Sequence, residues 1–402
     1  MTSTERARQL LAAVVFAVLL AQVLLYPGVP DLVAAVGATT ALDASMWFLA
    51  AEFAAFVAFA GVWGAMSDNL GRRVPLIVAG AVGGAVGYFA LALLPAALSL
   101  SFSEVLVVRA LQGATTIGAF SLAMTMLMDL EGGHGKNMGA AGIAIGLGTA
   151  IGAPLGGRLY GVGALAPVYA AGGLLLVAAV LALLVPDRAP AESPAVHGGR
   201  LRRAIDTLTA RPALGVPYVF GFIDRFTAGF FALVGTVYFR EAFGLDAAAT
   251  GLMLGLFFAP FALLQYPFGV LSDSIGRTLP IVAGSAVYGL AVLAVGLAPT
   301  VTTAGAAMVG VGVIGAFMAP ATMALVTDLS PDSGRGTAMA GFNVFGSLGF
   351  LGGILIGGTV ADEVGFLAAF VVAGVLETVI ALVSIPAFLK IGETGETAVF
   401  GR

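Results

Sequence analysis

Twelve apolar stretches, each about 20 residues or longer, dominate the sequence and leave little choice of fold. At 1.5 Å per residue, about 20 helical residues cross the ~30 Å hydrocarbon layer of a bilayer. The chain has 402 residues, of which 59% are hydrophobic and only 10% are charged, whereas a soluble domain usually carries about 25% charged residues. We therefore predict an all-α integral membrane protein with twelve transmembrane helices. The expected spans are residues 9–30, 45–66, 75–95, 102–128, 137–160, 164–186, 213–240, 247–271, 279–298, 301–326, 337–361 and 365–389.

The first apolar stretch follows a short basic segment with Arg6 and Arg8, as it would in a secretory signal peptide. No convincing cleavage site follows it, and the chain continues into further apolar stretches. We therefore expect a retained first helix.

A short charged island occurs twice, as GAMSDNLGRRVP at residues 64–75 and as GVLSDSIGRTLP at residues 269–280. Two pairs of dipeptides also recur at equivalent places, namely Asp129-Leu130 with Asp328-Leu329 and Gly156-Gly157 with Gly357-Gly358. A repeat at half the chain length indicates two homologous halves, related by a pseudo-two-fold axis along the membrane normal. We predict two pseudo-symmetric six-helix bundles, at residues 1–186 and 213–402, joined by a cytoplasmic linker at 187–212.

The basic residues concentrate on one side of the predicted topology. On the other side only Arg158 and Arg240 occur, both near helix ends. By the positive-inside rule, both termini and the linker are cytoplasmic, and we expect a multi-pass protein of the plasma membrane. The basic residues of the tails, the linker and the even-numbered loops are Arg6, Arg8, Arg72, Arg73, Lys136, Arg188, Arg200, Arg202, Arg203, Arg211, Arg277, Arg335, Lys390 and Arg402.

Composition also excludes several classes of function. A net charge of −4, without a stretch that interleaves basic and aromatic residues, argues against a nucleic-acid partner. The chain has no cysteine, and its two histidines, His134 and His197, lie in Gly-rich polar loops. We therefore expect no metal and no cofactor.

The repeated island resembles the loop between the second and third spans of the major facilitator superfamily, which reads G-x-L-a-D-r-x-G-r-r. Here Asn69 replaces a usual basic residue and Met66 replaces Leu. The resemblance covers essentially the whole chain, because span count, central linker and repeat spacing all agree. The matching residues are Gly64, Asp68, Gly71, Arg72 and Arg73.

Asp68 and Arg72, four residues apart, can pair at the membrane edge, with Asp129 as a third member. The resemblance implies that such a cluster latches the two halves in one state and breaks in the other. The alternative is that these charges only solvate a loop and fix the topology. The predicted latch residues are Gly64, Asp68, Gly71, Arg72 and Asp129 and, in the second half, Gly269, Asp273, Gly276, Arg277 and Asp328.

Arg109 in the fourth span and Glu52 in the second lie at similar depths. An unpaired arginine inside a bilayer costs at least ~2.5 kcal/mol, so we predict a Glu52–Arg109 pair with Gln112 on the same side. The arginine would keep the carboxylate ionised until a proton or a cationic substrate competes for it. The alternative is a static pair that only fixes helix packing. The stretch from Arg109 to Gly118 is similar to a superfamily motif, R-x-x-q-G-x-g.

The fifth span contains GTAIGAPLGG. It is similar to the motif G-x-x-x-G-P-x-x-G-G. Within the superfamily this motif is associated with exporters that exchange substrate for protons. The proline here stands one place further on than in the motif. Glycines at i, i+4 and i+8 create one smooth helix face, and the proline favours a bend. A packing face without any transport meaning is the alternative. The residues of the motif are Gly148, Gly152, Pro154, Gly156 and Gly157.

The second half carries Asp224 and Arg225 in the middle of the seventh span. Asp224 shares a face with aromatic residues, which suits a lipophilic cation, and we predict a role for it in proton coupling beside Glu52 and Arg109. Glu377 in the twelfth span has no predicted role. The resemblance implies a cavity lined by spans 1, 4, 7 and 10. The candidate cavity residues are Gln22, Tyr26, Gln112, Tyr218, Asp224, Gln265, Tyr266 and Asn343.

We predict a secondary transporter that works by alternating access, with proton-coupled efflux of lipophilic or cationic compounds as the leading function. The first alternative is a proton-coupled or facilitative importer of a small metabolite, such as a sugar or an organic acid. The second alternative is a membrane-embedded receptor or enzyme on a transporter-like scaffold. The expected partners are a small-molecule substrate, protons and the lipid bilayer, and we expect a monomer.

Overall fold

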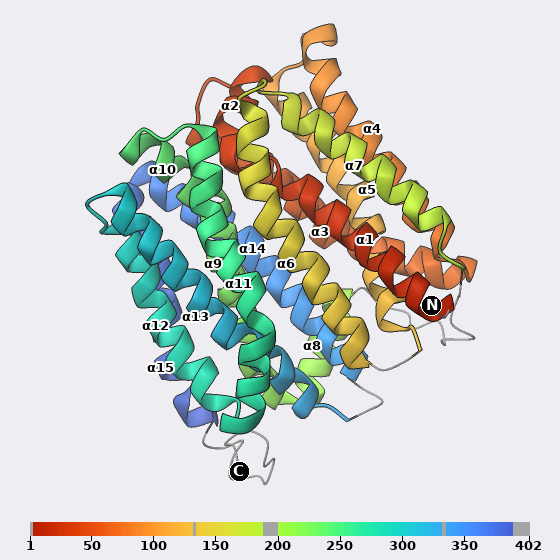
Figure 1. Cartoon of the computed structure of the whole chain (residues 1–402), viewed down its shortest axis with the longest axis vertical. Helices are drawn as coiled ribbons and strands as arrows, with labels where there is room; N and C mark the ends of the chain where they lie inside the picture. The colour runs from red at the N-terminus through yellow and green to blue at the C-terminus, as the bar shows by residue number, and fades with distance from the viewer. Residues whose placement is uncertain (1–2, 132–133, 188–199, 332–334, 389–402) are drawn as a thin grey trace. The chain divides into compact units, whose positions relative to one another are not determined.

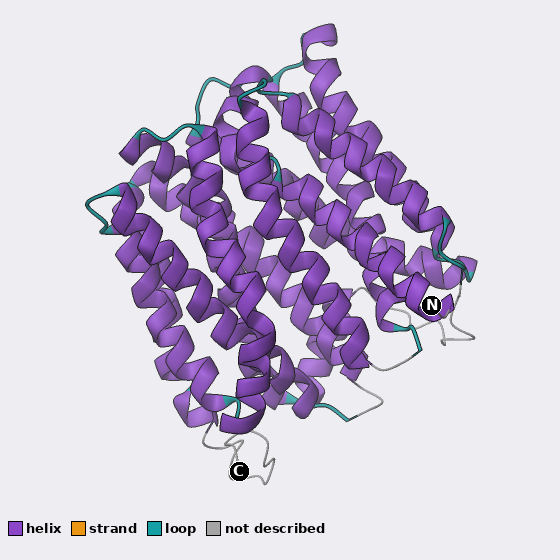
Figure 2. Cartoon of the chain, in the orientation of Figure 1, coloured by secondary structure: helices purple, strands orange, loops and turns teal. Residues whose placement is uncertain are grey.

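The computed structural model describes residues 3–131, 134–187, 200–331 and 335–388. Every regular element in these ranges is a helix (Figure 2). Twelve helical segments of this described part are long and apolar enough to cross a membrane, which confirms the predicted fold class. Residues 188–199 of the predicted linker, which include His197, and the tail from residue 389 lie outside the described residues.

The chain divides into two compact units, of which the first contains Met1–His197 and Phe239–Gly255. Within it, α5 packs against α3 and α4, α7 packs against α4, and α1 packs against α6 and α7 (Figure 1). A short 3₁₀ turn, Tyr26–Gly28, separates α1 from α2. The helices of this part are α1 (Ser3–Val23), α2 (Val29–Ala35), α3 (Leu42–Leu70), α4 (Val74–Leu98), α5 (Phe102–Met128), α6 (His134–Tyr160) and α7 (Ala166–Leu183).

The second unit contains Gly198–Tyr238 and Leu256–Arg402. Here α9 packs on α14, and α12 lies between α13 and α15 (Figure 1). A π-helical segment, Phe231–Gly235, interrupts the seventh span between α9 and α10. The helices are α8 (Arg200–Ala210), α9 (Gly215–Phe230), α10 (Thr236–Phe243), α11 (Ala247–Ile275), α12 (Thr278–Gly296), α13 (Val301–Asp328), α14 (Arg335–Glu363) and α15 (Phe366–Val383).

One boundary between the units falls within the predicted linker, between residues 197 and 198, and two further boundaries fall inside α10 and α11. Residues 239–255 group with the first unit because they pack closely on it. Gly157 on α6 lies directly against the backbone of Ala247. A Cβ on Gly157 would overlap the carbonyl oxygen of Ala247. Small residues allow such close approach of helices.

Both charged islands end a long helix and start the next one. Gly71 ends α3 at φ 62° and Gly276 follows α11 at φ 84°. Because this left-handed conformation is costly for residues with a side chain, glycine is the residue that suits both turns. The repeated glycines thus set where each loop turns, and the charged residues beside them are held at the ends of the helices.

The glycine face of α6 packs against α1. A Cβ on Gly152 would lie 2.9 Å from the Cβ of Val23, and one on Gly148 would lie 3.0 Å from the Cβ of Leu19. At Gly156 the added carbon would overlap the carbonyl of Leu24. The structure thus places these motif glycines in the tight contact that small residues make possible between membrane helices.

We expect Gly156→Ala to destabilise the protein, although alanine is the better helix former by about 1 kcal/mol. Overpacking a tight contact costs typically about 1–3 kcal/mol, so the net effect is a lower unfolding temperature in detergent. Gly139→Ala in the same helix is the matched control, because no atom lies within 4 Å of its new methyl group. Equal unfolding temperatures for the two variants would contradict the packing argument.

Candidate coupling site

A buried ion pair joins α3 to α5. Nη2 of Arg109 lies 2.5 Å from Oε2 of Glu52, and both side chains are completely buried. The guanidinium also lies over the ring of Phe48, 4.5 Å from its centroid, and 5.5 Å from that of Tyr88. A guanidinium over aromatic faces gains a cation–π attraction, which is stronger without water. The structure therefore brings the predicted pair together and adds two aromatic partners.

The pair continues along α5 as a hydrogen-bonded chain. Nη1 of Arg109 donates to Oε1 of Gln112 at 2.7 Å, and Nε2 of Gln112 donates to the hydroxyl of Thr116 at 2.8 Å. Residues three and four apart are neighbours on a helix surface, so the three side chains form one polar row. The sequence prediction missed Thr116, although its position four residues after Gln112 was a visible signal.

Gly113 explains why α5 can carry this row so close to α3. A Cβ at this position would lie 2.8 Å from the carbonyl oxygen of Glu52 and 3.0 Å from its Cα. Real Cβ atoms do not approach backbone that closely, so a larger residue here would push the helices apart. The glycine next to Gln112 thus fixes the spacing at which Arg109 reaches Glu52.

Several polar atoms around the pair lack a hydrogen-bond partner among the described residues. They are buried and include Oε1 of Glu52, Nε2 of Gln22 and the hydroxyl of Tyr88. Tyr26, 3% exposed, interacts electrostatically with both members of the pair. Buried polar groups are normally satisfied, and an exception calls for an explanation. Here the unmatched atoms lie around one buried ion pair.

We expect Glu52→Gln and Arg109→Gln each to cost about 3–5 kcal/mol of stability, because each leaves the other side chain charged and buried. The double variant should cost clearly less than the sum of the two, because no unpaired charge remains. Thermal unfolding of the four proteins in detergent measures this cycle. Additive losses would show that the two side chains do not depend on each other.

The first charged loop differs from the expected latch. Nη1 of Arg73, not Arg72, lies 2.6 Å from Oδ2 of Asp129, while Nε of Arg72 lies 3.6 Å from Oδ2 of Asp187. Asp68 is exposed and has no ion pair among the described residues. The reason is that this loop contains a second arginine and a further carboxylate, which take over the two bonds predicted for Asp68 and Arg72.

Asp187, which the sequence prediction missed, also caps α4. Its Oδ1 accepts the backbone N–H of Arg73 at 3.1 Å and that of Val74 at 3.3 Å. A carboxylate stabilises a helix N-terminus by accepting from its free N–H groups. An acidic residue directly after the sixth span was the signal for it.

The second charged loop has the predicted set of contacts. Nη1 of Arg277 lies 2.6 Å from Oδ1 of Asp273, and its Nε lies 3.0 Å from Oδ2 of Asp328. Burial disfavours the charged guanidinium, but the hydrogen bonds to the two carboxylates outweigh it and raise the pKa of Arg277. Both loops thus hold the ends of helices of their own unit by arginine–carboxylate bonds.

We expect Arg73→Gln to destabilise the first unit by about 1.5–3 kcal/mol, the usual loss for a hydrogen bond between charged groups. Arg72→Gln is the matched control and should change stability by less than about 0.5 kcal/mol, because the Arg72 side chain is 69% exposed and that of Arg73 only 6%. Thermal unfolding measures both. A larger loss of stability in Arg72→Gln than in Arg73→Gln would instead support the Asp68–Arg72 contact that the motif predicts.

Tyr218 does not line a cavity, contrary to the prediction. Its side chain is fully buried, and its hydroxyl donates to the carbonyl oxygen of Ala338 at 2.7 Å. Its ring fits against Gly341 on α14, where a Cβ would collide with the phenol. The space left by that glycine draws the tyrosine into the core of the second unit.

The other candidates of the second half are spread over several helices. Asp224 and Gln265 are half-buried, and Asn343 is exposed, while Tyr266 is 82% exposed. Arg225 is exposed too, and its stem lies over Gly346 of α14. None of these five side chains shares a hydrogen bond with another among the described residues. They therefore form no compact site comparable to that of the first unit.

An ion pair between α2 and α10 was not predicted. Arg240 donates from Nη1 to Oδ2 of Asp31 at 2.6 Å and from Nη2 to Oδ1 at 2.7 Å. Both residues belong to the first unit. Such a two-pronged pair is among the stronger ionic contacts of proteins, and it ties residues 239–255 to α2.

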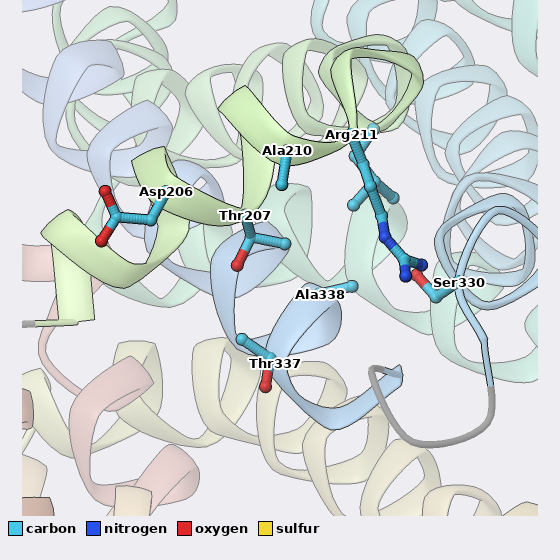
Figure 3. A pocket seen from close by; sticks show the side chains of 8 residues that line it. Asp206, Thr207, Ala210, Arg211, Ser330, Thr337 and Ala338 are labelled. Atoms are coloured by element: carbon cyan, nitrogen blue, oxygen red, sulfur yellow. The ribbon is translucent and has the colours of Figure 1, made fainter. Parts of the chain in front are cut away.

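A pocket of about 320 Å³ lies at the end of the second unit, under α8. The Arg211 side chain reaches toward Ser330 across it (Figure 3). None of the predicted site residues lines this pocket. Arg211, which does line it, was used only to assign the topology. It is lined by Asp206, Thr207, Ala210, Arg211, Leu214, Ser330, Thr337 and Ala338.

Twelve spans, a repeated charged loop and an ion pair inside the hydrocarbon region together define a multi-pass membrane protein built from two related halves. The chain belongs to the Major Facilitator Superfamily, whose sequence profile matches residues 11–237 and 217–398.

The matches to relatives by sequence cover only part of this chain and of each relative. An uncharacterised transporter of Methanocaldococcus jannaschii is 32% identical over 42% of this chain and 44% of its own. A class G tetracycline resistance protein of Vibrio anguillarum is 31% identical over 58% of this chain and 59% of its own. A synaptic vesicular amine transporter of Mus musculus is 28% identical over 71% and 56%. The chain thus spans about half the length of these relatives.

Solved structures share the fold over the whole chain. A bacterial homologue of the human lysosomal transporter Spinster, in an inward-facing conformation, is 15% identical, with a TM-score of 0.75 over 100% of this chain and 99% of its own. The nucleoside transporter NupG is 13% identical, with a TM-score of 0.73 over 96% and 100%. At such low identity these likenesses show the fold alone.

Proposed function

We propose that the protein is a proton-coupled exporter of lipophilic or cationic compounds. The single observation that carries this proposal is the buried Glu52–Arg109 pair with its unpartnered neighbours. A carboxylate in a low-dielectric site attracts either a proton or a cation. The likeness to a tetracycline resistance protein and to a vesicular amine transporter supports the direction and the kind of substrate.

The pair has two states that differ in charge. With Glu52 ionised, the carboxylate holds Nη2 of Arg109, and the pair is neutral as a whole. Protonation of Glu52 weakens this bond and leaves Arg109 with Gln112 and the ring of Phe48. A substrate cation that reaches Glu52 displaces the proton, so the two ligands exclude each other. Such exclusion at one carboxylate is the physical basis of antiport, since each state must be emptied before the other ligand binds.

The packing motif and the loops complete the proposal. The glycine face of α6 against α1 matches, apart from the shifted proline, the motif linked to proton-exchanging exporters. The arginine–carboxylate clusters of the two loops hold helix ends within each unit at the cytoplasmic side, with Arg73 in place of Arg72. We further propose a plasma-membrane location, cytoplasmic termini and a monomeric unit.

The proposal predicts that protons leave acid-loaded vesicles when a lipophilic cation is added outside. The purified protein is reconstituted with a pH-sensitive dye inside, and a panel of lipophilic cations, sugars and organic acids is tested. Glu52→Gln should abolish the proton movement, because its amide cannot be ionised. Glu363→Gln is the matched control, because this carboxylate is exposed at the end of α14 and should leave the signal unchanged.

Proton movement in the same direction as a sugar or an organic acid would instead show an importer. Tight binding of a compound that never crosses the vesicle membrane would indicate a receptor. Either result would overturn the proposal of export.

A further inference from the structure

The second unit contains a buried carboxylic acid that the proposed function leaves unused. Glu377 on α15 is 0% exposed. The hydroxyl of Ser285 on α12 donates to its Oε1, and its Oε2 lies 3.4 Å from the hydroxyl oxygen of Thr227 on α9. Three helices of one unit therefore meet at this single carboxyl group.

The hydrogen bonds accommodate the neutral acid as well as the carboxylate. The Thr227 hydroxyl has one hydrogen, and the carbonyl oxygen of Ile223 lies 3.3 Å away as another acceptor for it. If Glu377 carries a proton on Oε2, it donates to Thr227, Thr227 donates to Ile223, and Ser285 donates to Oε1. Every donor then has an acceptor, as buried polar groups require.

In the part of the chain that the structure describes, no cation compensates a charge at Glu377. Among the ion pairs of the described residues, none includes Glu377. Gly289 on α12 and Gly374 on α15, one turn from Glu377, bring the two helix backbones into direct contact. An ionised carboxylate without an opposite charge nearby is strongly disfavoured in such surroundings. A proton on Glu377 would remove this cost.

A second carboxyl group, Asp224, lies near this site on α9. It precedes Thr227 by three residues on α9 and is half-buried, whereas Glu377, Ser285, Thr227 and Tyr288 are completely buried. Asp224 interacts electrostatically with Glu377 and Tyr288, and Arg225 is its charged neighbour. From α14, which also packs on α15, no charged group of the described residues interacts with Glu377.

Tyr288 supplies an independent sign that the cluster is built for a mobile proton. Its hydroxyl is buried and has no hydrogen-bond partner among the described residues, yet it interacts electrostatically with both carboxyl groups. A phenol can accept a proton from one group and donate its own to another. An unsatisfied phenol beside two acids has the capacity that a relay needs.

We propose that Glu377 is a second proton-binding site of this transporter and that it exchanges its proton with Asp224. The proposal rests on the proposed proton coupling. In the exchange, the O–H bond at Oε2 of Glu377 breaks and one forms at a carboxyl oxygen of Asp224, so the two carboxyl groups share one proton throughout. The emptied Glu377 carboxylate is then stabilised by the hydroxyls of Ser285 and Thr227.

Infrared difference spectroscopy of the purified full-length protein during a pH titration tests this assignment. We expect the C=O band of a protonated carboxylic acid to be present, to disappear in Glu377→Gln and to remain in Glu363→Gln. Ser285→Ala should shift the band, because one hydrogen bond to the carbonyl is lost, and this variant also covers the case that Glu377→Gln does not fold. Asp224→Asn should change the pH at which the band titrates.

A spectrum that is identical in Glu377→Gln would show that Glu377 is ionised and would overturn the proposal. A C=O band that does not change with pH and is the same in Asp224→Asn would show a static proton that only holds the helices together. This result would also overturn the proposal.

The vesicle assay separates this proposal from the proposed function. We expect Glu377→Gln to move fewer protons per substrate than the wild type while transport continues. If the wild type couples protons to substrate and Glu377→Gln moves the same number, only the second site is refuted. If the wild type moves no protons with any substrate, the proposed function fails, and with it any role of Glu377 in coupling.

Discussion

The scarcity of water inside a bilayer is the constraint on which the polar chemistry of this protein depends. Each charged or polar side chain within a span needs a partner from the protein, because lipid offers none. The Glu52–Arg109 pair meets this need with opposite charges, two aromatic faces and the amide of Gln112. Glu377 meets it by giving up its charge and using hydroxyl groups. The two units thus solve one problem of solvation in opposite ways.

These two solutions have different consequences for proton binding. An ion pair gains a net positive charge when its carboxylate is protonated. The surrounding groups then interact with that charge. A neutral acid among hydroxyls can pass its proton to a second acid without changing the charge of the site. The first arrangement suits competition with a charged substrate, while the second suits storage and transfer of a proton.

Much of the fold could be predicted because hydrophobic length and the repeated island act over many residues. The helices nevertheless run beyond the apolar stretches: α3 continues to Leu70, where Gly71 ends it. Backbone hydrogen bonds favour continuation of a helix until a residue such as glycine breaks it. The π-helical segment at Phe231–Gly235 has no comparable signal in the sequence.

The site was partly predictable for a similar reason. A charge inside an apolar span must find a partner, so depth alone pointed from Arg109 to Glu52. The depth of a residue in the membrane could not show that the Tyr218 ring packs against Gly341 in the core of its unit. It also could not show that Asp187 bonds to the arginines of the charged loop. Those contacts depend on local space and on residues distant in the sequence, and neither leaves a periodic pattern.

The ion pair between Asp31 and Arg240 has a consequence for how the chain is made. The first unit is completed by residues 239–255, which follow the seventh span. During synthesis, the first six spans therefore emerge with Asp31 still unpaired and with the surface around Gly157 uncovered. The unit can close only when the ribosome has passed residue 255, so its assembly in the membrane has to wait for a segment of the other half.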